Sequence, residues 1–261
     1  MYKRQEVERR QLYVALPFIP CQARLVVLLA FASAYFAGEP ALAVGAVAVA
    51  YLASVLLFAA SSLLVRRAYR VAEPPELLME LPPIHLPSLR VLWWISWDYA
   101  KHYLRRAGFI IFSVSLLLTA LTRLGPGGFV ESPGESLAFA AGRALAPLMA
   151  PLGLAGERAA ILAFAMLAGL LAKEVVVLSV AAATGSADPL EALASLSLSR
   201  GQALALMVFF STYMPCAATA ATIYRETGSG RLTALAVAWS LASSLLLTYL
   251  TYAILALLGL A

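Results

Sequence analysis

The chain has 261 residues, of which 62% are hydrophobic and only 13% are charged. Soluble domains have roughly half apolar and about a quarter charged residues, so this composition excludes an ordinary soluble domain and predicts a polytopic membrane protein in contact with the lipid bilayer. The net charge of +5 does not indicate nucleic-acid binding, because the basic residues lie beside apolar runs, where they orient membrane segments. The sequence has no phosphate-binding loop, zinc-protease motif or nucleophile elbow, so we expect no enzyme and no catalytic residues.

The apolar runs approach or exceed the length of about 20 residues that crosses a bilayer as a helix. Several runs are interrupted by prolines or charges. We therefore predict an all-α fold, namely a transmembrane helical bundle with broken or re-entrant helices and an interfacial amphipathic helix.

The N-terminal flank, residues 1–11, is basic. Its first five residues, Met-Tyr-Lys-Arg-Gln, are what a transposon-end sequencing adapter encodes in one reading frame. Our hypothesis is that residues 1–5 are not native and that the gene is cut on its 5′ side.

Residues 12–70 contain two apolar runs, about 12–36 and 41–65, which we predict to be the first two spans. The first run holds a Pro-Cys motif. The second run ends in arginines, and the positive-inside rule places both this end and the N-terminal flank in the cytoplasm.

Residues 71–106 change in composition. A proline-rich loop comes first, and prolines hold their neighbours in extended conformations. Tryptophans and cations then alternate from about residue 88 to 106, which is typical of an amphipathic helix on the membrane surface. A third span, about 107–121, follows directly.

Residues 107–261 form the last predicted segment, which we interpret as a gate-type membrane region. The stretch 137–154 is too short for a span and favours a re-entrant hairpin or an interfacial helix. We predict three further spans, at about 159–183, 203–223 and 232–258. This count of six crossings places the basic residues after the fifth span, Arg225 and Arg231, on the wrong side for the positive-inside rule.

The two Pro-Cys motifs are the most informative feature. Residues 20–23 and 215–218 both have the pattern Pro-Cys-x-Ala, and they hold the only two cysteines. Proline has no N–H, so a helix through each motif would leave one carbonyl unpaired, that of Leu16 or Ser211. Lipid offers this carbonyl no partner, so each break must lie against protein or a wet cavity.

A thiol beside unpaired carbonyls can bind a partly dehydrated, borderline-soft divalent cation, and discontinuous helices commonly line transport sites. We therefore propose Cys21 and Cys216 as transient metal ligands. The alternative is that both cysteines are small hydrophobic residues at home in a membrane helix. Helical spacing places Thr212, Cys216 and Thr219 on one face, so both hydroxyls are candidates to line the pathway. Met214 is either a packing residue or a thioether ligand.

Lys173 and Glu174 lie inside the predicted fourth span, where a charge costs about 2.5–3.5 kcal/mol and normally faces the bundle interior. Either Glu174 forms a structural ion pair with another span, for which Arg24 is one candidate, or it is a third metal ligand on the ion path. Lys173 is a pathway-lining candidate. Ala165 and Gly169 share its face and would permit close approach of another helix.

Six motifs occur in order along nearly the whole chain, and together they resemble one known family. They are Ile-Pro-Cys-Gln-Ala-Arg-Leu (19–25), Met-Glu-Leu-Pro-Pro-Ile-His-Leu-Pro (79–87), Arg-Ala-Gly-Phe-Ile-Ile (106–111), Leu-Ala-Pro-Leu-Met-Ala-Pro-Leu-Gly (145–153), Leu-Ala-Lys-Glu-Val-Val-Val (171–177), and Tyr-Met-Pro-Cys-Ala-Ala (213–218) with Arg-Glu-Thr-Gly (225–228). The family is that of ferrous iron transport protein B, FeoB. The resemblance covers its membrane domain from the middle to the C-terminus.

The resemblance implies uptake of Fe(II) through the cytoplasmic membrane, with Cys21 and Cys216 lining the iron path. The transported ion is then the substrate, and no permanently bound cofactor is expected. The family also has a GTP-binding domain and a first gate segment with a Gly-Cys-Asn-Val-Pro motif, neither of which occurs in this chain. GTP would therefore bind only to a missing or separate G domain. The expected partners are this G domain and further copies of the chain in a homo-oligomer.

Two other functions remain open from the sequence. A gate-type transporter for an organic solute such as a nucleoside predicts aromatic and amide side chains at the breaks, where this chain has thiols. A non-transporting membrane scaffold predicts that both Pro-Cys sites can be replaced without functional loss.

Overall fold

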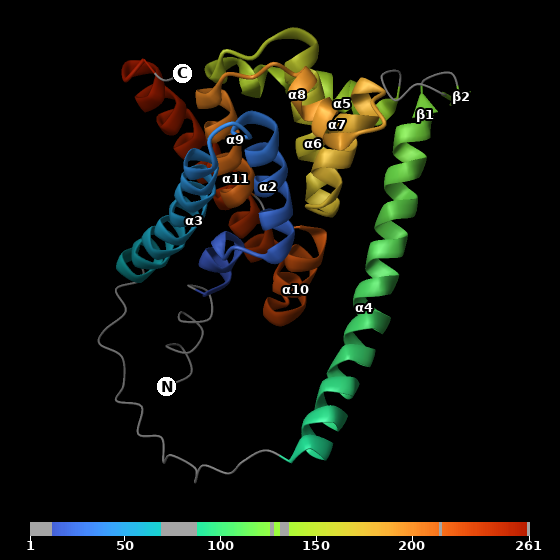
Figure 1. Cartoon of the computed structure of the whole chain (residues 1–261). Helices are drawn as coiled ribbons and strands as arrows, with labels where there is room; N and C mark the ends of the chain where they lie inside the picture. Colours follow the sequence, from blue (N-terminus) through green and yellow to red (C-terminus); the bar gives the residue numbers. More distant parts are fainter. Residues whose placement is uncertain (1–11, 69–87, 126–127, 131–135, 214–215, 260–261) are drawn as a thin grey trace.

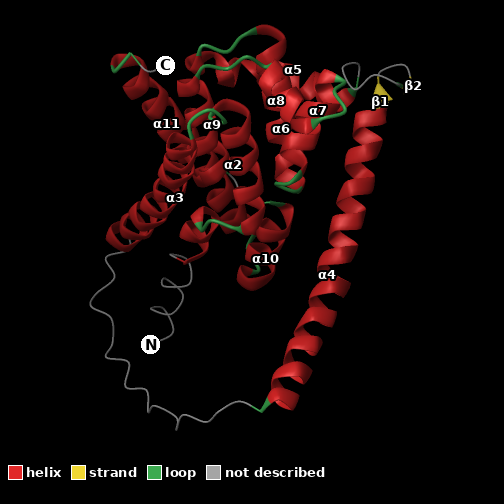
Figure 2. Cartoon of the chain, viewed as in Figure 1, coloured by secondary structure: helices red, strands yellow, loops and turns green. Residues whose placement is uncertain are grey.

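The structure is a computed structural model that describes residues 12–68, 88–125, 128–130, 136–213 and 216–259. The described part is almost entirely helical (Figure 2), which confirms the all-α prediction. Its strands are two short ones, β1 (Leu124–Gly125) and β2 (Gly128–Phe129), which pair antiparallel. The N-terminal flank, most of the proline-rich loop and Met214 lie outside the described residues.

The first two predicted spans form an antiparallel pair. A short 3₁₀ helix, η1 (Leu16–Phe18), is followed by α2 (Gln22–Tyr35), which rises to the upper side of the bundle as drawn in Figure 1. The helix α3 (Pro40–Ala68) then descends to the lower side, where its last turn carries Arg66 and Arg67. Both segments are long and apolar enough to cross a membrane.

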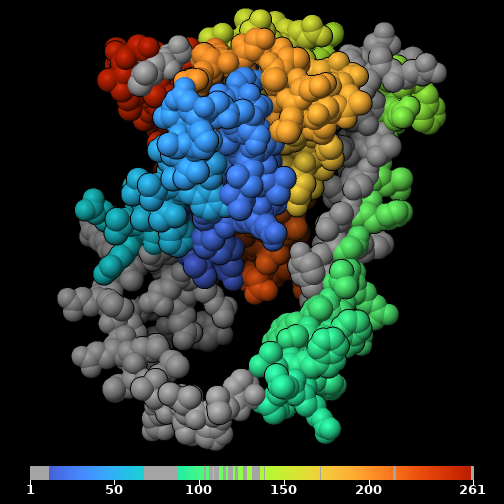
Figure 3. Space-filling view, viewed as in Figure 1, coloured from blue at the N-terminus to red at the C-terminus, as the bar shows by residue number. Residues whose placement is uncertain are grey.

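The helix α4 (Leu89–Arg123) is continuous over 35 residues and runs from the lower to the upper side. The predicted surface helix and the predicted third span are therefore one continuous helix, and α4 is not among the four described segments that are long and apolar enough to cross a membrane. Ser88 caps its start by accepting from Val91 N. Its upper end contacts α5 and α6, whereas its lower half stands apart from the rest of the described molecule (Figure 3).

A group of short helices covers the upper side. It comprises α5 (Leu137–Leu145), the 3₁₀ helix η3 (Ala146–Leu152) and α8 (Pro189–Ser195). The segment 139–152 meets α6 (Gly156–Leu171) at 110°, so residues 137–154 form no span of their own, as the prolines predict.

The helix α7 (Val175–Thr184) folds back on α6 instead of continuing it. A Cβ placed on Gly169 would lie 2.5 Å from a methyl group of Val176, and residues seven apart in one continuous helix could not come so close. The prediction of a fourth span at 159–183 is therefore wrong. These residues form a re-entrant hairpin with its tip at 172–174, and both of its ends lie at the upper side.

The centre of the bundle is α9 (Arg200–Thr212), in which every residue from 205 to 212 is buried. It packs against α2, α3 and α11. After a break it continues as α10 (Ala217–Thr227) to the lower side, and α11 (Gly230–Leu257) returns to the upper side. The predicted break in the fifth span and the predicted sixth span are both confirmed.

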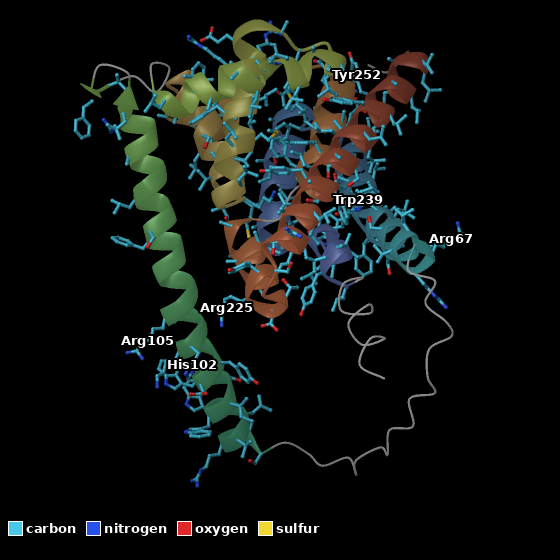
Figure 4. All side chains as sticks on the ribbon, turned by 180° about the vertical axis from the view of Figure 1, so that it is seen from behind. Arg67, His102, Arg105, Arg225, Trp239 and Tyr252 are labelled. Carbon is cyan, nitrogen blue, oxygen red and sulfur yellow. The ribbon has the colours of Figure 1, made fainter. Side chains whose placement is uncertain are left out.

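Because a hairpin replaces the predicted fourth span, each later helix end lies on the opposite side of the membrane from the one that the six-crossing count predicts. Arg225 lies at the lower end of the molecule, as do Arg67 and Arg105 (Figure 4). The conflict with the positive-inside rule in a six-crossing count therefore disappears. The chain is a multi-pass membrane protein in which four described segments are each long and apolar enough to cross a bilayer.

Candidate functional site

Both Pro-Cys motifs break their helices at the predicted places. The first lies between η1 and α2, and the second lies between α9 and α10. Cys21 is the residue immediately before α2, and Cys216 is the residue immediately before α10. The two thiols thus occupy equivalent positions, each at the N-terminus of a helix, where the helix dipole favours an anionic ligand.

The carbonyls that the breaks expose are paired with protein groups, as a break inside a membrane requires. The Ser54 hydroxyl on α3 lies 2.8 Å from the Phe18 oxygen and 2.9 Å from the Ser211 oxygen, so one hydroxyl serves both breaks. Ser211 in turn donates to the Ala50 oxygen at 2.7 Å. The Leu16 oxygen accepts from the Ile19 N–H at 3.1 Å.

The Arg24 side chain joins the two breaks a second time. It is only 3% exposed, and its guanidinium donates to the Ile19 oxygen at 3.1 Å and to the Pro17 oxygen at 2.6 Å. The same group donates to the Tyr213 oxygen in the second break at 3.1 Å. Arg24 therefore does not form the ion pair with Glu174 that was one prediction, because backbone carbonyls take its donors instead.

The tip of the re-entrant hairpin provides a third break at the same place. Lys173 is also only 3% exposed, and its ammonium donates to the Tyr213 oxygen at 3.4 Å. The same nitrogen lies 3.1 Å from the centre of the Tyr213 ring, which is a cation–π contact. The first break, through Arg24, and the hairpin tip, through Lys173, therefore both contact Tyr213 at the second break.

Tyr213 is fully buried and holds the hairpin against α9. Its hydroxyl donates to the Met166 oxygen on α6 at 3.2 Å. Gly169 leaves the space for it, because a Cβ at this position would lie only 2.1 Å from the Tyr213 hydroxyl oxygen. The predicted close approach of another element at Gly169 is confirmed.

Each of the two breaks also carries a thiol. Cys21 is exposed and Cys216 is half-buried, and neither is in a disulfide. Both thiols are within electrostatic range of the Arg24 guanidinium and of the Lys173 ammonium. Cys216 Sγ also lies 3.4 Å from Thr219 Oγ1, so the predicted association of these two residues is present.

The remaining predicted site residues are placed differently. Thr212 is buried at the end of α9, and its hydroxyl donates to the Val208 oxygen, so the break separates it from the face that carries Cys216 and Thr219. Glu174 is exposed at the hairpin tip, directly before α7, and it forms no ion pair with the described residues. The described residues include no cluster of three or more His, Cys, Asp or Glu side chains that could hold a metal ion.

Sequence reasoning did not assign roles to Ser54 or Tyr213, and it gave Arg24 the wrong partner. Tyr213 lies within the second Pro-Cys stretch, but its cation–π partner Lys173 is 40 residues away in the chain, so no local pattern indicates the contact. Ser54 sits in an apolar helix with no signal that distinguishes it from other serines of α3.

Broken helices that meet inside a membrane bundle are a recurring feature of transport proteins. Comparisons with known proteins make this class specific. Residues 104–230 match the Gate family, described as "Nucleoside recognition", and residues 47–98 match the family described as "Ferrous iron transport protein B C terminus".

Curated relatives carry the name "Fe(2+) transporter FeoB". The protein from Staphylococcus aureus (strain COL) is 33% identical over 248 residues, which is 95% of this chain and 36% of the relative. The protein from Methanocaldococcus jannaschii is 33% identical over 221 residues, 81% of this chain and 32% of the relative. The chain belongs to the FeoB family and corresponds to its C-terminal membrane part. It spans about a third of the length of these relatives, and no solved structure matches it significantly.

Proposed function

We propose that the chain forms the membrane-embedded C-terminal part of a ferrous iron transporter, which moves Fe(II) across the cytoplasmic membrane into the cell. The observation that carries this proposal is the pairing of the two Pro-Cys breaks. Ser54 and Arg24 each contact carbonyls of both breaks, and both thiols lie within electrostatic range of the same two cations. Thiols and carbonyl oxygens together suit a borderline-soft divalent cation better than a large organic solute.

In this proposal Cys21 and Cys216 are transient ligands, and Thr219 lies beside the second thiol. Conduction requires weak binding at more than one site, since a tight site would not release the ion. Two separated thiols and a few carbonyls fit that requirement better than a closed four-ligand site. The exposed Glu174 carboxylate at the hairpin tip would attract the cation on its approach.

The arrangement of charges supports an orientation for uptake. More described basic residues lie at the lower side, at the ends of α3 and α10 and along the lower part of α4, than at the upper side, where helix ends carry Arg123, Arg143, Arg158 and Arg200. By the positive-inside rule the lower side would be cytoplasmic. We further propose that GTP acts through a G domain on another segment or chain, and that the assembly includes further copies.

The test is iron uptake by cells whose transporter contains this chain. Cys216→Ser is expected to lower the rate of Fe(II) uptake several-fold without lowering the amount of protein in the membrane. Ala218→Ser, an exposed position on the same helix, is the matched control and should transport normally. Unchanged uptake in Cys216→Ser would remove the thiol from the mechanism.

A nucleoside transporter is the second candidate, because the Gate family is described as "Nucleoside recognition". Competition distinguishes the two functions. Excess nucleoside should leave Fe(II) uptake unchanged if the proposal is correct, and nucleoside uptake that depends on Cys216 would contradict it.

A further inference from the structure

The centre where the three breaks meet contains two buried cations and no described carboxylate. Arg24 and Lys173 are each 3% exposed, and both donate to the Tyr213 oxygen. Glu174 is adjacent in sequence but exposed, and no acidic side chain among the described residues interacts with either cation. Two positive charges directed at one oxygen are unfavourable, so this placement needs an explanation beyond packing.

The Lys173 ammonium occupies a place that would suit a permeating cation. It is held by a carbonyl oxygen that a helix break has exposed and by the face of an aromatic ring. Carbonyl oxygens at broken helices are the groups that replace the hydration shell of an ion in transport proteins. The groups nearby that can carry a negative charge are the thiols of Cys21 and Cys216, which the proposed function assigns to the metal.

The two cations differ in how firmly they are held. Arg24 makes three hydrogen bonds, two of them to η1 and the residue that follows it, directly before its own helix. Lys173 makes one long hydrogen bond, at 3.4 Å, and one ring contact, from a flexible side chain. It also lies in the non-helical segment between α6 and α7, so it can leave without unwinding a helix.

We propose that Lys173 is a tethered cation that plugs the metal passage and must leave the Tyr213 carbonyl and ring before a divalent cation can pass between the two thiols. This inference rests on the proposed function. In the resting state the lysine ammonium occupies the cation site, and the arriving metal ion displaces it by charge repulsion. Lys173 would thus set which cations open the passage, since a monovalent ion repels it less strongly.

The test measures how fast Cys216 reacts with thiol reagents in the full chain in liposomes, with Cys21→Ser so that one thiol is left. Three methanethiosulfonates of different charge are compared: a neutral methyl reagent, an anionic sulfonatoethyl reagent and a cationic trimethylammonioethyl reagent. Lys173→Met removes the charge but keeps the length, Lys173→Ala removes both, and Lys173→Arg keeps both.

A unit charge about 10 Å away at an effective dielectric constant of about 20 changes a rate by on the order of tenfold. The anionic reagent then loses an attraction and the cationic reagent loses a repulsion, so Lys173→Met should lower the ratio of anionic to cationic reactivity by about the square of this factor, on the order of a hundredfold, and should not raise the neutral rate. Lys173→Ala should lower the ratio equally and also raise the neutral rate several-fold, because the space is then open. Lys173→Arg should give the same ratio of anionic to cationic reactivity as the parent.

A neutral rate in Lys173→Ala equal to that of the parent would overturn the plug, provided that the variant elutes as a folded species. If Lys173→Ala does not fold, the ratio in Lys173→Met decides, and an unchanged ratio overturns the proposal. Fe(II) entry into liposomes that hold the chain with both cysteines, with and without Lys173→Met, separates this inference from the proposed function. If the Lys173 substitutions shift the thiol reaction rates but no Fe(II) enters, iron transport alone is refuted. If Fe(II) enters in a way that depends on the cysteines but the Lys173 substitutions do not shift the thiol reaction rates, the plug alone is refuted.

Discussion

At the scale of single residues, Ser54 shows how a membrane bundle accommodates two breaks with very few polar groups. Its hydroxyl has one proton, yet it lies within hydrogen-bond distance of one carbonyl from each Pro-Cys break. An exposed carbonyl without a partner costs about 1–3 kcal/mol when buried, and neither lipid nor a neighbouring apolar side chain can reduce that cost. The serine therefore matters more to this fold than its small size suggests.

We expect Ser54→Ala to lower the free energy of unfolding by about 1–3 kcal/mol, because the Phe18 and Ser211 oxygens lose their donor. Thermal or denaturant unfolding in detergent measures the effect. Ser33→Ala on α2 is the matched control, since Ser33 is exposed, and it should unfold like the parent. Equal stability of the two variants would show that the hydroxyl does not support the breaks.

The sequence identified the cysteines but not the groups around them. A repeated Pro-Cys-x-Ala pattern is visible in the linear chain, and proline chemistry predicts which carbonyls lose their helical partners. Which donors replace those partners depends on the distant segments that the fold brings there. Ser54 and Ser211 are 157 residues apart, and Arg24 and Tyr213 are 189 residues apart, so local patterns could not pair them.

At the scale of elements, the re-entrant hairpin is the main difference from the sequence-based prediction. Residues 159–183 are apolar and long enough to span, and the tip, Ala172-Lys173-Glu174, contains neither proline nor glycine. Local propensity therefore predicts a continuous helix through it. The turn forms because the tip makes better contacts with Tyr213 than lipid offers, and because Gly169 lets α7 and Tyr213 approach α6 closely.

Gly169→Ala should loosen the hairpin, because the new methyl group would lie 2.1 Å from the Tyr213 hydroxyl oxygen and 2.5 Å from a Val176 methyl. Overpacking of this kind costs about 1–3 kcal/mol. The expected results are a lower unfolding temperature in detergent and faster proteolysis between α6 and α7. Gly45→Ala on α3 has nothing within 4 Å of the new Cβ and serves as the control. A Gly169→Ala protein as stable as Gly45→Ala would contradict the packing described here.

At the scale of the whole molecule, the hairpin decides which ends of the helices share a side of the membrane. It enters and leaves at the upper side, so α9 and α10 together descend and α11 rises. Arg225 therefore lies on the same side as Arg67, although a count of apolar runs places them apart. Composition and run length predicted the bundle, its broken helices and four of its crossings. The side of the membrane on which the later helix ends lie depends on the hairpin, and only the tertiary fold shows the hairpin.

Labelling of single cysteines tests this topology in a background with Cys21→Ser and Cys216→Ser. Arg67→Cys and Arg225→Cys should react with a membrane-impermeant reagent from one side of the membrane, and Asp188→Cys from the other. All three positions are exposed, and permeabilised membranes give the total reactivity of each as a control. Reaction of Asp188→Cys from the side of Arg67→Cys, with Arg225→Cys reacting from the opposite side, would show that the hairpin is a full crossing.

The position of the hairpin in the chain also has a consequence for biogenesis. Lys173 is synthesised 40 residues before Tyr213, so its charge has no partner while α6 and α7 leave the ribosome. A lysine in lipid without a partner is expensive, which disfavours early insertion of the tip. Because the hairpin returns to the side it came from, α9, α10 and α11 acquire the same orientation whether or not it has inserted. Insertion of the hairpin is thus a late step. It follows assembly of the surrounding helices and fills the centre of the bundle.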